Sequence, residues 1–130
     1  MPSILDRLRS LLCCSPPPQV TGVVAQTGGG SGEVFVAWSP LPPAAGVAFY
    51  RVYRRTAPGV WRPLAAVTGA ATDPGFPGKV AMLDFAGTFP GGGSGGGDED
   101  AGGLRRYVVA AVGTSGLEGP WSAEASGGPP

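Results

Sequence analysis

The sequence predicts an all-β fold in which about seven short antiparallel strands form two packed layers. Its longest β-favouring stretch, residues 105–113, is rich in aromatic and β-branched residues and apolar on both sides, as in a central strand covered on both faces. Six other short runs are separated by Gly- and Pro-containing turns. The 130 residues include 24 Gly and 15 Pro yet are 42% hydrophobic, so the loop-rich chain retains enough apolar residues for a core.

The first two strands are predicted at 19–25 and 33–38. Prolines precede the first run, as is common at the entry to an edge strand. In the second run, Val34, Val36 and Trp38 share one face at the two-residue period of a strand, and we place that face inward.

The third and fourth strands are predicted at 47–55 and 60–67. Tyr50 and Val52 point inward in the third strand. Its opposite face is mostly polar-ended and therefore expected to be wet, and it carries Phe49, Arg51, Tyr53 and Arg55. In the fourth run Pro63 cannot donate to a ladder, which favours an edge strand.

The last three strands are predicted at 79–85, 104–113 and 120–125. The connection at 87–103 is a flexible glycine-rich loop that contains three consecutive acids, Asp98 to Asp100. These acids lack the spacing of a calcium loop and are interpreted as a solvated charge run.

Residues 1–15 are predicted to form a short amphipathic helix or tail ahead of one domain at 16–126, and 127–130 form a second tail. One stripe of the helix collects Ile4, Leu5, Leu8, Leu11 and Leu12. A helix this short needs a surface to dock on, which is either the flank of the domain or a membrane or partner.

Composition excludes several classes of function. Nine basic and nine acidic residues cancel, which gives no support for nucleic-acid binding. Histidine is absent and the two cysteines, Cys13 and Cys14, lie outside the domain, so we predict no enzyme activity, no cofactor and no metal. No apolar run could span a bilayer and no secretory signal is recognisable, which favours the cytoplasm by default and limits membrane contact to residues 1–14.

Three motifs carry a family resemblance. They are Val34-Phe35-Val36-Ala37-Trp38-Ser39-Pro40, Tyr50-Arg51-Val52-Tyr53-Arg54, and Tyr107-Val108-Val109-Ala110-Ala111-Val112 followed by a glycine turn. Over about residues 16–125 the chain resembles a fibronectin type III domain, with Arg105 where that family has its corner tyrosine. The resemblance implies an immunoglobulin-like β-sandwich, a recognition or spacer role that allows an extracellular location, and one sheet formed by the third, fourth, sixth and seventh strands.

The outer face of that implied sheet is the candidate site. It would collect Arg51, Tyr53, Arg55, Trp61, Arg62 and Arg106, and Arg, Tyr and Trp are typical of interaction hot spots. We therefore predict a non-catalytic binding or scaffolding module that recognises a protein or a glycan.

Three other interpretations stay open. The face residues are also what any water-exposed sheet needs, and the helix at 1–15 would act as a membrane or assembly anchor. A carbohydrate-binding accessory module would require Tyr53 and Trp61 to be exposed and close together. Trp38 and Trp121 are assigned to the core or its edge.

Overall fold

The computed structural model describes residues 15–27, 33–85 and 105–127. The predictions made for the helix at 1–14 and for the glycine-acid loop at 87–103 lie outside these ranges. Seven strands occur in the described part of the chain: β1 (Val24–Thr27), β2 (Glu33–Trp38), β3 (Val47–Ala57), β4 (Val60–Val67), β5 (Val80–Phe85), β6 (Arg105–Gly113) and β7 (Ala125–Gly127).

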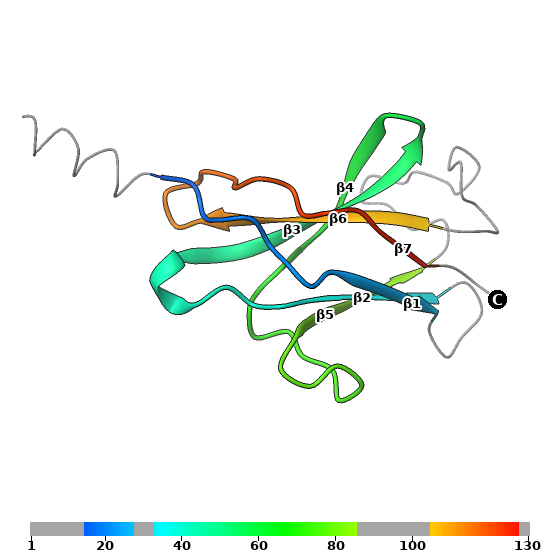
Figure 1. Ribbon diagram of the computed structural model, residues 1–130, viewed down its shortest axis with the longest axis horizontal. Coiled ribbons are helices and arrows are strands. Elements are labelled where there is room, and N and C mark those ends of the chain that lie inside the picture. Colours follow the sequence, from blue (N-terminus) through cyan, green and yellow to red (C-terminus); the bar gives the residue numbers. More distant parts are fainter. Residues whose placement is uncertain (1–14, 28–32, 86–104, 128–130) are drawn as a thin grey trace, which may run out of the picture.

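The strands form two antiparallel sheets, with orders β1-β2-β5 and β4-β3-β6-β7 (Figure 1). The all-β prediction is thus confirmed, as is the grouping of the third, fourth, sixth and seventh strands in one sheet. The two strands that carry the aromatic-rich motifs, β3 and β6, pair directly, with Val52 opposite Val109 and Tyr53 opposite Val108. Strand β4 lies at the edge of its sheet, as Pro63 predicted. A proline is tolerated there because an edge strand pairs on one side only.

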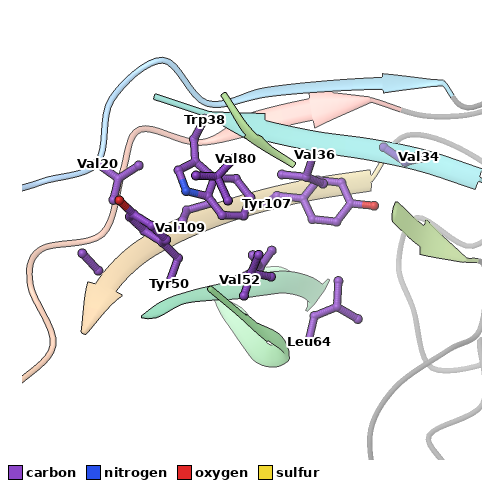
Figure 2. Close-up of a cluster of buried hydrophobic side chains, with 12 residues drawn as sticks. Val20, Val34, Val36, Trp38, Tyr50, Val52, Leu64, Val80, Tyr107 and Val109 are labelled. Atoms are coloured by element: carbon purple, nitrogen blue, oxygen red, sulfur yellow. The ribbon is translucent and has the colours of Figure 1, made fainter. Parts of the chain in front are cut away.

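The hydrophobic core lies between the two sheets (Figure 2). The predicted inward faces are confirmed, because Val34, Val36 and Trp38 on β2 and Tyr50 and Val52 on β3 are all buried. The rings of Trp38 and Tyr50 meet edge to face at 5.6 Å between centroids. The Tyr50 hydroxyl accepts a 2.8 Å hydrogen bond from the backbone N–H of Leu41, so this polar group is satisfied at the core margin.

The first strand begins later than predicted. Residues 19–23 are not part of it, and β1 starts at Val24. Gly22 has φ +69°, a left-handed conformation that interrupts an extended run, and Thr21 accepts a hydrogen bond from the backbone N–H of Ser39 instead of joining the β1–β2 ladder. The apolar residues therefore predict that a strand exists here, and the backbone conformation at Gly22 explains why the strand begins only at Val24.

The seventh strand also begins later than predicted, and Gly127 belongs to it rather than to a tail. Residues 118–124 run beside β6 without regular pairing: the N–H groups of Gly119 and Ser122 donate to the carbonyls of Ala111 and Val109. These donors are three positions apart instead of two and Pro120 has no N–H, so the regular alternation of a ladder is broken. This irregular stretch, residues 118–124, is called the β6-flanking segment below.

The outer face of β6 is apolar and buried as well. Val108, Ala110 and Val112 point away from the core, yet they are 4%, 0% and 3% exposed.

Among the described residues, no helix is long and apolar enough to cross a membrane.

Candidate binding face

The candidate site is the outer face of the β4-β3-β6-β7 sheet, the side turned away from the other sheet. Strand β3 supplies its axis, because residues at alternate positions point to the same side. Neighbouring side chains come from β4, β6 and the β6-flanking segment. The face therefore depends on strand pairing between parts of the chain more than 50 residues apart.

Glu118 organises one part of this face. Its carboxylate accepts hydrogen bonds from Arg51 Nη1 at 3.1 Å, from Tyr53 Oη at 2.6 Å and from Trp121 Nε1 at 3.3 Å. Arg51 also lies over the ring of Phe49, with its guanidinium carbon 5.4 Å from the ring centroid. Burial, followed by the hydrogen bond to Glu118, raises the pKa of Tyr53 above its ordinary value of 10.

Three aromatic rings meet beside Glu118. The rings of Tyr53 and Trp121 lie 4.6 Å apart between centroids with a 32° tilt, and Trp61 meets Trp121 edge to face at 5.9 Å. Trp121 is 39% exposed, and Tyr53 and Trp61 are half-buried. We call Tyr53, Trp61 and Trp121 the aromatic cluster.

Glu124 organises the opposite end of the face. Its Oε1 lies 4.0 Å from Arg55 Nη1 and 3.7 Å from Arg106 Nη1. Both cations are partly exposed, with side chains at 19% and 36%. Arginine–carboxylate pairs therefore flank the aromatic cluster on both sides along β3.

The structure brings five of the six predicted face residues together: Arg51, Tyr53, Arg55, Trp61 and Arg106. Arg62 is placed differently. It pairs with Arg54, whose side chain points between the sheets, so alternation puts Arg62 on the opposite side of β4 from Trp61.

Sequence reasoning missed Trp121 as a member of this face and missed Glu124 altogether. The prediction that Trp121 belongs to the core or its edge is not met, because it is 39% exposed and stacks on Tyr53. The predicted regular strand at 120–125 gave no indication of this contact. The observed β6-flanking segment follows an irregular path beside β6, and Trp121 in it reaches Tyr53.

A second polar cluster lies buried between the sheets. Arg54 Nη1 donates to both carboxylate oxygens of Asp84 at 2.8 and 3.1 Å, and Tyr107 Oη donates to Asp84 at 2.5 Å. Arg105 Nη1 is 3.7 Å from the same carboxylate. All four side chains are at most 2% exposed, and we call them the inter-sheet cluster.

Asp84 and Glu118 each bind an arginine from a distant part of the chain. Their partners are 30 and 67 residues away along the chain, so no local pattern could have indicated them. Burial, and then the charge of Asp84, raises the pKa of Tyr107 well above its ordinary value of 10.

Hollows on the described surface are small. One of about 220 Å³ lies on the binding face beside Arg51 and is walled by residues 63–66 of β4. Ligand pockets that bury a small molecule usually exceed about 300 Å³. In the ranges that the structure describes, no group of three His, Cys, Asp or Glu side chains could hold a metal ion.

No protein-family model and no curated protein matches this sequence. Similar folds occur in solved structures. A β-1,2-glucanase from Parabacteroides distasonis matches with TM-score 0.52 and 20% identity over 88% of this chain and 13% of that chain. The pectate lyase Pel3 from Pectobacterium carotovorum matches with TM-score 0.51 and 14% identity over 82% of this chain and 27% of that chain. At these identities the likeness concerns the fold of a small part of each enzyme.

Proposed function

We propose that this chain is a non-catalytic binding module, an immunoglobulin-like β-sandwich of the fibronectin type III kind that recognises another macromolecule through its outer sheet face. The observation that carries the proposal is the aromatic cluster, which Glu118 fixes in a partly exposed position. The strand orders β1-β2-β5 and β4-β3-β6-β7, with both aromatic-rich motifs paired in one sheet, support the family assignment.

The energetic reason lies in the exposed apolar ring area. Fixed aromatic rings give a large contact area with little loss of side-chain entropy on binding, and this is why they dominate interaction hot spots. Burying Trp121 against a partner would remove apolar surface from water. The hydrogen bonds to Glu118 pre-organise the rings, which reduces the ordering cost of association.

Capture of partners by the full-length chain tests the proposal. The site variant is Trp121→Ala, and the matched control is Phe76→Ala, which removes a half-buried ring that packs on Phe35 at 5.7 Å on the outer side of the other sheet. We expect the control to retain the partners of the wild type and the site variant to lose them, with both variants showing a cooperative thermal transition. Equal recovery by all three proteins would contradict the proposal.

A further inference from the structure

We propose that the aromatic cluster binds sugar rings of an uncharged polysaccharide by stacking on their apolar C–H faces. This inference rests on the proposed function and names the ligand class of the same face. It follows from three properties of the site: which atoms of the rings remain available, how the surrounding charges are balanced, and how far the site extends.

The polar atoms of two rings are already committed. Tyr53 Oη and Trp121 Nε1 each have one hydrogen to donate, and both donate to the carboxylate of Glu118. What these residues leave exposed is therefore apolar ring surface. Ring faces suit a ligand that presents C–H groups, such as the axial hydrogens on one side of a pyranose.

The same commitment disfavours an extended peptide directly over Tyr53 and Trp121, because the N–H donors that remain available belong to the arginines on either side of these rings. Peptide carbonyls need donors on the surface that they cross, because an unmatched carbonyl loses its hydrogen bond to water. In grooves that bind proline-rich peptides, aromatic rings supply packing surface and the rim supplies such donors. Here Glu118 has consumed the donors of Tyr53 and Trp121.

Each arginine around the cluster lies within 4.0 Å of a carboxylate, and three arginines against two glutamates leave a net charge of only +1. Arg51 pairs with Glu118, and Arg55 and Arg106 share Glu124. A phosphate-rich ligand would approach these two carboxylates and be repelled, whereas nucleic-acid sites are dominated by unopposed cations. A paired guanidinium still has several N–H donors and a carboxylate has several acceptor positions, so hydroxyl groups find both kinds of partner beside the rings.

The extent of the site indicates a polymer rather than a single sugar. Arg51 and Arg55 are four residues apart on β3, which corresponds to about 13 Å along a strand, and Tyr53 lies between them. The hollow beside Arg51 is only about 220 Å³, so the face leaves a ligand largely in solvent. A chain that crosses the face would contact polar pairs at both ends and rings at the centre.

Affinity electrophoresis of the full-length chain tests this inference. Native gels contain one soluble polysaccharide each: β-1,2-glucan, hydroxyethyl cellulose, xylan, fully methyl-esterified pectin or polygalacturonic acid. We expect retardation by at least one uncharged polymer, unchanged between about 0.1 M and 1 M salt because no ion pair with the ligand forms. Trp121→Ala should weaken it about tenfold or more, and Phe76→Ala should not.

Three results would overturn the inference. Salt-sensitive retardation by polygalacturonic acid alone would mean that the face selects anions. Equal retardation of Trp121→Ala and wild type would place the sugar elsewhere. If no polymer retards the wild type but Trp121→Ala loses the partners that the wild type captures, the glycan inference fails and the proposed binding face stands. If electrophoresis shows no retardation and Trp121→Ala captures the same partners as the wild type, the glycan inference and the proposed binding face both fail. Circular dichroism melts confirm that each variant is folded, and the more conservative Trp121→Leu replaces Trp121→Ala if that variant unfolds.

Discussion

The inter-sheet cluster and the cluster around Glu118 contain the same chemistry in opposite surroundings. Each has an arginine and a tyrosine that donate to one carboxylate. The side chains of Arg54 and Asp84 are 0% and 1% exposed, whereas those of Arg51 and Glu118 are 38% and 27% exposed. A buried charge depends strongly on its partner, whereas a charge in contact with water depends on it much less. The first cluster therefore concerns stability, and we propose that the second concerns recognition.

Position explains this division. The inter-sheet cluster joins β3 and β6 of one sheet to β5 of the other, so its hydrogen bonds hold the two sheets in register. The Glu118 cluster joins elements of a single sheet and leaves the packing between the sheets untouched. Removing corresponding atoms from the two clusters should therefore give very different results.

The largest effect is expected for Asp84→Asn. The change leaves buried guanidinium groups facing a neutral amide, and breaking one side of a buried ion pair costs about 3–5 kcal/mol. Urea denaturation measures the loss in the free energy of unfolding. Glu118→Gln is the matched control and should cost about 1 kcal/mol or less. Equal losses for the two variants would show that burial does not separate the clusters.

An intermediate effect is expected at alkaline pH. The pKa of Tyr107 is raised in the fold, first by burial and then by Asp84, while an unfolded tyrosine ionises near pH 10. Above about pH 10 the unfolded chain therefore binds fewer protons than the folded one, and the free energy of unfolding falls by about 1.4 kcal/mol per pH unit. Below that pH the contribution is fully present.

Tyr107→Phe isolates this contribution. The variant lacks the phenol of Tyr107 and should lose that part of the alkaline slope, while Tyr53, whose pKa is also raised, keeps its own part. At neutral pH the change should cost about 1–3 kcal/mol because Asp84 loses a buried hydrogen bond. Urea denaturation at a series of pH values measures both quantities. A slope that is the same in wild type and variant would contradict the assignment to Tyr107.

The smallest effect on stability is expected for Glu118→Gln, and its signature is a change in the titration of Tyr53. The carboxylate contributes to the raised pKa of Tyr53 through a hydrogen bond and through its charge. Neutralising it should lower that pKa toward 10, although burial, the larger cause, keeps part of the shift. Tyrosinate absorbance during an alkaline titration, with Tyr53→Phe to identify the step, measures the change. An unchanged titration would mean that Glu118 does not contact the phenol in solution.

Much of the fold was predictable because strand periodicity is local. On β2, Val34 and Val36 flank the more exposed Phe35, and on β3, Tyr50 and Val52 flank the more exposed Arg51, which is enough to assign two strands and their inner faces. The starts of the first and last strands were less predictable. They depend on the left-handed Gly22 and on the path of residues 118–124, which are set by contacts with distant backbone.

The sequence by itself determined the all-β class and the inward and outward positions along β2 and β3, because side-chain alternation and turn residues act over a few positions. The grouping of strands that forms the candidate face was an implication of the family resemblance. Only the tertiary structure placed Trp121 on Tyr53, gave Arg51 and Tyr53 the shared acceptor Glu118, and buried Arg54 with Asp84 and Tyr107. These contacts join residues 23 to 68 positions apart. Their formation depends on how the sheets pair and pack, which no short stretch of sequence records.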